Sequence, residues 1–214
     1  MSDIELNDFE IKYVKNVYDN IAEDFSRTRY KHWSYTEKYL KSINNPSKIL
    51  EVGCGNGKNF CVDIHDYYGI DISKELIKYV PDKYKNNVRY GNALNLPYDD
   101  DSFDHVMSIA VIHHLSNKYK RLKALEEMYR VLKKGGTMIF SVWAFDKNDK
   151  KRDKSDKMVR FKKRNGDIYY RYYNMSTEEE FRTLVDMLIK KRNITLEKLD
   201  FEKQNYYAIM KKIS

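Results

Sequence analysis

The segment 51–57, Glu-Val-Gly-Cys-Gly-Asn-Gly, constrains the fold of this 214-residue chain more than any other. It follows a short apolar run at 48–50, and a second apolar run after it ends in an acid, Asp71. Glycine accepts positive φ and lacks a Cβ, so a ligand can lie against the backbone of such a turn. An acid after the next strand can accept hydrogen bonds from ribose hydroxyls. The pattern therefore predicts a strand, a glycine turn opening a helix, and a nucleotide-like ligand. A simple glycine hairpin would leave Glu51 and Asp71 unexplained.

The hydrophobic periodicity predicts an alternation of strands and helices along the chain. Alternating strands and helices form a parallel sheet, to which a final hairpin adds an antiparallel strand. We therefore expect an α/β, Rossmann-like fold with a seven-stranded, mostly parallel sheet and a C-terminal antiparallel hairpin. The expected strands are 48–52, 67–71, 87–90, 104–110, 137–143, 194–201 and 206–210. One domain, 1–214, is expected from the length, with helices in 1–45 over the active site.

Basic residues are concentrated in one part of the chain. The formal net charge is +8, and 146–166 contains ten Lys or Arg against four Asp. Little of this stretch is apolar, so we expect a flexible basic loop over 146–168. Such a loop is either a solvated insertion or an electrostatic arm for a polyanion. The charge alone does not distinguish these two interpretations.

Composition excludes several classes of protein. No apolar stretch approaches the length of a membrane span, and the first residues lack the basic and apolar regions of a signal peptide. The two cysteines, Cys54 and Cys61, form no metal-ligand pattern and are too few for a disulfide framework. We therefore expect a cytoplasmic protein with reduced thiols, no membrane association and no metal site.

Several motifs resemble those of a known enzyme family. The G-x-G-x-G spacing after an acid differs from the G-x-G-x-x-G of NAD(P) enzymes and resembles the S-adenosyl-L-methionine (SAM) loop of class I methyltransferases. Across nearly the whole chain, other motifs resemble the eukaryotic tRNA wobble-uridine carboxymethyl methyltransferases. They are Asn16-Val-Tyr-Asp-Asn-Ile-Ala22, Arg27-Thr-Arg-Tyr-Lys-His-Trp33, the loop to Asn59, Gly91-Asn-Ala-Leu-Asn-Leu-Pro97, Ser108-Ile-Ala-Val-Ile-His-His-Leu115, Ser141-Val-Trp-Ala144 and Arg171-Tyr-Tyr173.

This resemblance implies an activity and two partners. Members of the family use SAM to methylate the carboxylate of 5-carboxymethyluridine at the tRNA wobble position, giving a methyl ester. They work with a small zinc-binding activator protein. In class I methyltransferases the third strand lies at a sheet edge, and an unpaired edge favours pairing with another chain. We therefore expect tRNA, and not DNA, as substrate, and a heterodimer formed through the edge strand 87–90.

The resemblance also implies the cofactor site. Asp71 is expected to bind the ribose hydroxyls of SAM. Asn92 stands where the family usually has Asp, a departure that points to weaker cofactor affinity. The expected cofactor-binding residues are Glu51, Gly53, Gly55, Asn56, Gly57, Asn59, Asp71, Ile72, Asn92, Ala93, Leu94 and Ala110.

The substrate side needs positioning more than a base, because a carboxylic acid of pKa near ~4 is already ionised at neutral pH. Arg29 and Arg171 are expected to hold a carboxylate or phosphate, since guanidinium does so bidentately. Tyr30, with Trp33 and Trp143, could stack on an unstacked base. His113 is preferred over His114 for the site. The expected catalytic residues are Arg29, Tyr30, His113 and Arg171, while Trp143 either lines the pocket or fills the core.

Two other functions fit parts of the sequence. A small-molecule SAM methyltransferase would keep the fold and the glycine loop, but it would leave 27–33 and the basic residues without a purpose. A catalytically silent SAM-fold subunit that binds RNA or a protein partner would have degraded cofactor residues. Here Glu51, the three loop glycines and Asp71 are all present. Within the expected cofactor site, Asn92 alone favours the silent subunit.

Overall fold

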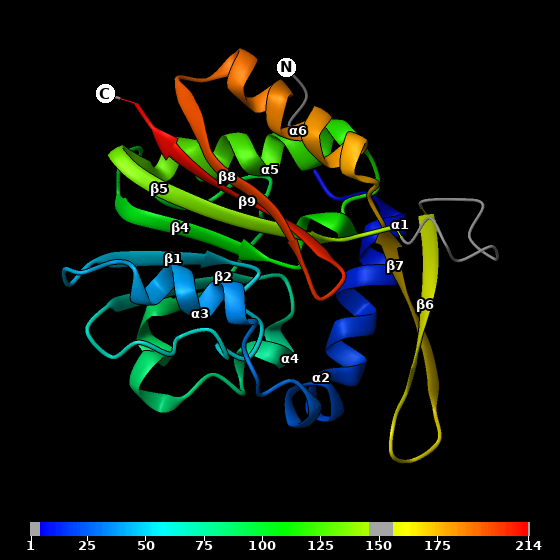
Figure 1. Ribbon diagram of the computed structural model, residues 1–214. Coiled ribbons are helices and arrows are strands. Elements are labelled where there is room, and N and C mark those ends of the chain that lie inside the picture. Colours follow the sequence, from blue (N-terminus) through cyan, green and yellow to red (C-terminus); the bar gives the residue numbers. More distant parts are fainter. Residues whose placement is uncertain (1–4, 146–155, 214) are drawn as a thin grey trace.

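The computed structural model describes residues 5–145 and 156–213 as a central twisted sheet with helices on both faces (Figure 1). The strands are β1 (Lys48–Val52), β2 (Asp66–Asp71), β3 (Val88–Tyr90), β4 (Phe103–Ile109), β5 (Leu132–Trp143), β6 (Asp156–Lys162), β7 (Ile168–Asn174), β8 (Ile194–Glu202) and β9 (Asn205–Lys212). The α-helices are α1 (Asp8–Glu10), α2 (Asn16–Thr28), α3 (Ser34–Lys41), α4 (Lys74–Ile77), α5 (Lys118–Val131) and α6 (Glu178–Lys191). A π-helical turn, Ile11–Lys15, joins α1 to α2, and short 3-10 helices cover Asp82–Asn87 and Ile112–His114.

The main sheet has the predicted architecture. Its seven strands follow the order β3-β2-β1-β4-β5-β9-β8 within the described residues. The first five are parallel, whereas β9 runs antiparallel to both β5 and β8. The expected α/β fold with a C-terminal antiparallel hairpin is therefore confirmed, and the short strand β3 lies at one edge.

Alternating side chains place two apolar cores on the two faces of this sheet. Successive residues of a strand point to opposite faces. In β5, Met138 and Phe140 pack with α5 and α6, while Ile139 packs on the other face with Tyr39 of α3. Both faces are thus buried, which is the usual environment of a parallel sheet. The carboxyl ends of the strands stay available for a ligand.

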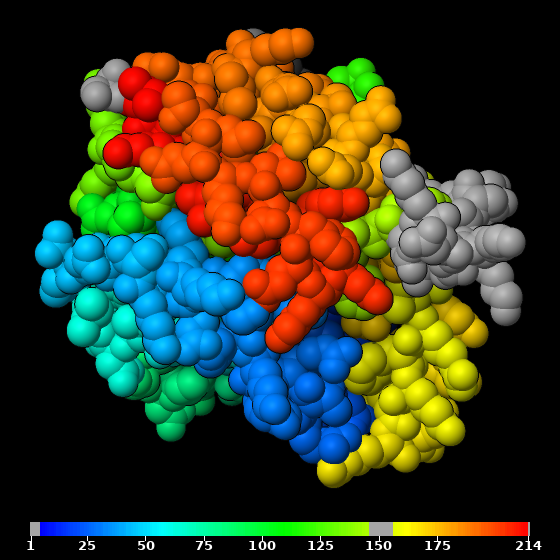
Figure 2. Space-filling model, viewed as in Figure 1, coloured from blue at the N-terminus to red at the C-terminus, as the bar shows by residue number. Residues whose placement is uncertain are grey.

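A second, two-stranded sheet corrects one expectation. Residues 156–168, predicted as part of a flexible basic loop, form β6 and the turn into β7. The turn contains Asn165-Gly166, and Gly166 has φ +96°, a conformation that suits glycine at a hairpin turn. In Figure 1 this hairpin extends beside α2, and Figure 2 shows it against the N-terminal helices. The remaining residues of the predicted loop, 146–155, lie outside the described residues.

Among the described residues, every helix is too short or too polar to cross a lipid bilayer.

Candidate active site

A cavity lies at the carboxyl ends of β1, β2 and β4, roofed by residues of the N-terminal helices and of β7. It brings together most of the residues that the sequence singled out. From the predicted cofactor set it is lined by Glu51, Gly53, Gly55, Asn56, Asn59, Asp71, Ile72, Asn92, Ala93 and Ala110. From the predicted catalytic set it is lined by Arg29, His113 and Arg171.

The glycine turn is fixed to the neighbouring strand β2. The backbone N–H groups of Gly53 and Cys54 both donate to the carbonyl of Ile70, over 2.7 and 3.1 Å. Gly53 has φ +78°, and a Cβ at this position would lie 2.4 Å from the side chain of Val111. Glycine is therefore required there by both conformation and space. The turn is held rigidly against the cavity.

Two polar side chains beneath this turn have unused acceptor atoms. Glu51 is 1% exposed, and its Oε1 accepts a hydrogen bond of 2.6 Å from Nδ2 of Asn59. Oε2 of Glu51 and Oδ1 of Asn59 are buried with no partner among the described residues. Burial raises the pKa of Glu51 to about 8. Buried acceptors without partners are costly, so this pair is suited to a cationic hydrogen-bond donor in the cavity.

Asp71 closes the other side of the same turn. Its Oδ2 accepts a hydrogen bond from the N–H of Gly55 over 2.7 Å, and its Oδ1 accepts one from the N–H of Ser73 over 2.8 Å. Burial raises the pKa of Asp71 to about 6, against these two backbone hydrogen bonds, which favour the ionised form. Each carboxylate oxygen has a second lone pair, so two hydroxyl donors can still be accepted. Nearby, Oδ1 of Asn92 accepts from the N–H of Leu94 over 3.0 Å, which fixes the amide at the cavity wall.

Backbone contacts give the two adjacent histidines opposite tautomers. Nδ1 of His114 lies 2.7 Å from the carbonyl of Tyr172, which only accepts, so Nδ1 carries the proton and Nε2 accepts from the Tyr18 hydroxyl. In His113 the backbone N–H of Trp143 donates to Nδ1, so the proton of the neutral ring is on Nε2. Burial lowers the pKa of both rings, to about 3 for His114 and well below the usual value for His113.

His113 is therefore the histidine whose ring N–H is available to donate a hydrogen bond. Its ring is 1% exposed and its Nε2 has no partner among the described residues, whereas both ring nitrogens of His114 are used within the protein. The His113 ring stacks on Tyr173 with the ring centroids 4.8 Å apart. Neutral His113 is consequently a donor at the cavity wall and not a base.

Arg171 brings a buried positive charge to the same place. It is 4% exposed, and its guanidinium carbon lies 5.2 Å from the centroid of Tyr173 and 5.3 Å from that of Phe161. No carboxylate pairs with it among the described residues, and its Nε has no hydrogen-bond partner there. A buried charge that is held only by aromatic faces requires an anion, because such a charge is otherwise expensive to bury. Arg171 and His113 Nε2 thus make this part of the cavity an anion site.

Three predicted residues do not line the cavity. Tyr30 is 68% exposed and lies outside it, because it follows the end of α2 on the surface. Gly57 belongs to the turn itself, where its N–H donates to the carbonyl of Cys54. Leu94 is buried in the apolar core. Trp143, for which the sequence left two possibilities, lines the cavity, with its ring centroid 4.7 Å from that of Tyr173.

Residues that the sequence did not single out also line the cavity. Lys58 follows the glycine turn, and burial lowers the pKa of its amine. The hydroxyl groups of Tyr18 and Tyr173 form a hydrogen bond of 3.2 Å. The N-terminal segment that carries Tyr18 is tied down by a buried ion pair between Glu10 and Lys120, and by a 2.7 Å hydrogen bond from Ser73 Oγ to Asp19. Lys58, Tyr18 and Tyr173 all lie within motifs that resemble the family, but the sequence analysis assigned no role to any of them.

Known proteins resemble this chain in sequence and in three-dimensional structure. Residues 50–140 match the family model described as a methyltransferase domain. Over 143 residues the chain is 44% identical to the tRNA (carboxymethyluridine(34)-5-O)-methyltransferase of Arabidopsis thaliana, with 66% of this chain and 35% of that protein covered. The protein of the same name from Schizosaccharomyces pombe is 41% identical over 70% of this chain and 65% of its own length. The chain thus spans less than two thirds of these relatives.

A further relative is covered more fully. A putative methyltransferase of Encephalitozoon cuniculi is 39% identical over 67% of this chain and 68% of its own length. Among solved structures, a DhpI-SAM-HEP complex matches with a TM-score of 0.74 at 15% identity, covering 97% of this chain and all of that one. A complex of the Haloferax volcanii Trm112 methyltransferase activator with a putative methyltransferase matches with a TM-score of 0.68 at 17% identity, covering 94% and 98%. At these identities the structures support the fold alone. The sequence matches show that the chain belongs to the methyltransferase family that includes the tRNA (carboxymethyluridine(34)-5-O)-methyltransferases.

Proposed function

We propose that this chain transfers a methyl group from SAM to the carboxylate of 5-carboxymethyluridine at the tRNA wobble position, producing 5-methoxycarbonylmethyluridine. The observation that carries the proposal is the buried Arg171 guanidinium without an anionic partner, beside the unused Nε2–H of His113. Together they suit a carboxylate at the end of the cavity away from the glycine turn. The relatives named for this reaction support the choice of substrate.

The residues around the glycine turn fit SAM. Oε2 of Glu51 and Oδ1 of Asn59, both buried without partners among the described residues, suit the α-ammonium group of the methionine moiety. Asp71 suits the ribose hydroxyls, and Ile72, Asn92 and Ala93 suit the adenine. Bound there, the cofactor would supply an electrophilic methyl group on a sulfonium centre.

The chain's own part in the reaction is positioning. The substrate carboxylate is already ionised at neutral pH, so no general base is required, and neutral His113, with its proton on Nε2, does not act as one. Arg171 and His113 would hold the carboxylate in line with the methyl group, and Trp143 and Tyr173 would exclude water from the reacting pair. Positioning of this kind can contribute ~7–11 kcal/mol to lowering a barrier.

Mass analysis of tRNA nucleosides tests this function directly. After incubation with SAM, the wild-type chain should convert carboxymethyluridine in tRNA to its methyl ester and leave a panel of small carboxylic acids unmethylated. Methylation of the small acids, and not of tRNA, would replace the proposal by a small-molecule enzyme. Failure to bind SAM in calorimetry would favour a silent subunit.

We further propose that a small zinc-binding activator pairs with the edge strand β3, giving a heterodimer in the cytoplasm. β3 is short and lies at the sheet edge, where backbone groups are open to strand addition. The N–H of Gly91 donates to Asp71 in β2, and that of Val88 donates to Lys85. Alternation along the strand then directs the N–H of Tyr90 away from the sheet.

We propose a single methyltransferase domain over 1–214, with the helices of 1–45 over its site.

A further inference from the structure

Basic residues are concentrated in two segments near each other in the fold, one of which contains Arg29, a residue that lines the cavity. One segment spans the end of α2, where 27–31 contains three basic residues and no acid. The other is the hairpin tip, where 160–164 contains four basic residues and no acid. The hairpin tip is joined to α2 by a hydrogen bond of 3.3 Å from the Arg164 N–H to Asp24, three residues before Arg27. We call this surface the basic rim. It consists of Arg27, Tyr30, Lys31, Lys162, Lys163 and Arg164.

Most of the charge on the rim is not neutralised by the protein. Arg27 pairs with Asp24 over 2.8 Å. The side chains of Lys31, Lys162 and Arg164 are exposed, and they form no ion pair with any described residue. The exposed ring of Tyr30 lies beside one of these charges, with the Lys31 amine 5.8 Å from its centroid. An exposed aromatic ring with unpaired cations on the same surface is a usual combination for binding single-stranded nucleic acid.

A line of aromatic rings and cations leads from the rim into the cavity. The guanidinium of Arg29, beside Tyr30, lies 5.6 Å from the ring of Phe25. The Phe25 and Phe161 rings are 6.3 Å apart, and the Phe161 ring is in turn 5.3 Å from the guanidinium of buried Arg171. Positive charge therefore continues from the surface to the anion site, along contacts between α2 and the hairpin.

We propose that the basic rim docks the phosphate backbone of the single-stranded anticodon loop, with one base stacked on Tyr30, while the wobble nucleotide enters the cavity. This inference rests on the proposed function for the identity of the RNA. None of the rim residues lines the cavity, but Tyr30 and Lys31 directly follow Arg29, which does. Its role is in RNA affinity and not in the chemical step.

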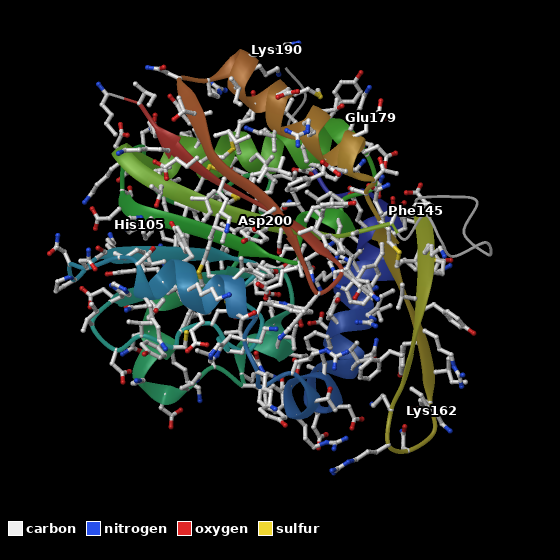
Figure 3. The ribbon with its side chains drawn as sticks, in the orientation of Figure 1. His105, Phe145, Lys162, Glu179, Lys190 and Asp200 are labelled. Carbon is white, nitrogen blue, oxygen red and sulfur yellow. The ribbon has the colours of Figure 1, made fainter. Side chains whose placement is uncertain are left out.

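The test compares two variants of equal charge. Lys162→Gln/Lys163→Gln removes two charges from the rim, and Lys190→Gln/Lys211→Gln removes two exposed charges from α6 and β9. Lys162 and Lys190 lie at opposite ends of the molecule in Figure 3. The probe is a fluorescent anticodon stem-loop RNA containing 5-carboxymethyluridine, whose dissociation constant is measured over a range of salt. For each phosphate that the protein no longer neutralises, the slope of log K against log salt should fall by about 0.7.

The rim variant should therefore lower the slope by about 1.4 and weaken binding about 25-fold near ~0.1 M salt, whereas the control should behave as wild type. Tyr30→Ala should weaken binding about 5- to 150-fold, and Tyr30→Phe should bind as tightly as wild type. All variants should keep wild-type SAM affinity. RNA binding by the rim variant equal to that of the control would overturn the proposal. So would a rim variant that binds RNA normally and has lost affinity only for anionic vesicles of phosphatidylcholine and phosphatidylserine.

Failure of the proposed reaction and failure of the docking surface give different results. If the wild-type chain binds the RNA through the rim but transfers no methyl group to carboxymethyluridine, the docking surface stands and the reaction is wrong. If it methylates the RNA and the rim variant has an unchanged KM, the reaction stands and the docking surface is wrong.

Discussion

The backbone N–H of Trp143 donates a hydrogen bond of 3.2 Å to Nδ1 of His113, and this contact makes the histidine a hydrogen-bond donor toward the cavity. The lowered pKa of His113 keeps the ring neutral throughout the physiological range. His113→Ala should therefore reduce kcat/KM for tRNA about 10- to 150-fold, the value of one hydrogen bond to a charged group, and leave SAM affinity unchanged. Steady-state kinetics and calorimetry measure the two effects. A rate that rises through pH 6–7 in wild type and not in the variant would show instead that His113 acts as a base.

Asp71 should make SAM affinity depend on pH. Its pKa is raised to about 6 by burial, so below pH 6 the carboxyl becomes protonated and loses its strength as an acceptor for ribose hydroxyls. Affinity should fall about tenfold for each pH unit below 6, since the bound state favours the ionised form. Asp71→Asn should bind SAM weakly at every pH. Asp66→Asn, an exposed carboxylate at the other end of β2, is the matched control and should retain the wild-type profile.

Glu51 should release a proton when SAM binds. Its pKa of about 8 means that most of the protein holds the proton at pH 7, while a cationic ammonium group beside Oε2 favours the ionised form. Affinity should consequently rise as pH increases toward 8. Calorimetry in buffers of different ionisation enthalpy should detect the released proton in wild type and in Asp66→Asn, and none from this position in Glu51→Gln. Equal proton release by Glu51→Gln would assign the proton to another group.

Arg171→Lys tests geometry apart from charge. Lysine keeps the positive charge but cannot hold a carboxylate with two parallel N–H groups, and it stacks less well between Phe161 and Tyr173. We expect kcat/KM to fall about 10- to 100-fold with SAM affinity retained. Arg160→Lys, on the opposite face of the same hairpin, should keep wild-type activity. Weakened SAM binding in Arg171→Lys would place this residue at the cofactor instead.

Tyr90→Pro should separate the fold from the activator complex. Proline removes the N–H of Tyr90, which is directed away from the sheet, and it leaves the hydrogen bonds of Val88 and Gly91 in place. The complex should be lost in gel filtration while the melting temperature of the isolated chain changes little. Tyr90→Ala keeps the N–H and should retain much of the binding. An intact complex with Tyr90→Pro would mean that the activator uses another surface.

The sequence predicted the main sheet well because its central strands β1, β4 and β5 are largely buried and read as apolar runs between turn residues. The β6–β7 hairpin was missed for a physical reason. Its inner face alternates Val159 and Phe161 with outward cations, and Asn165-Gly166 is a hairpin signal, but the high charge density suggested a solvated loop. Burial of Phe161 depends on contact with Phe25, more than a hundred residues away in the sequence, which no local pattern reveals.

Parts of the candidate site could be predicted where a residue type and its spacing indicate a binding role. The glycine turn, Asp71 and His113 stand out by spacing and by motif. The choice of His113 over His114 stays a prediction; it is supported by two backbone contacts that the sequence does not display. The unpaired state of Arg171, and the exposure of Tyr30, are likewise properties of the packed structure.

The hydroxyl chain from Tyr173 through Tyr18 to His114 joins residues as far as 155 positions apart, and this separation dictates when the site can form. Contacts between distant residues are made late, because long loops must close first. During synthesis the glycine turn and the parallel strands are available well before β7 emerges. The cofactor half of the site can therefore assemble early, whereas the substrate half is completed only when the hairpin docks on α2. The two proposed activities would thus report on different stages of folding, SAM binding on an earlier one and methyl transfer on a later one.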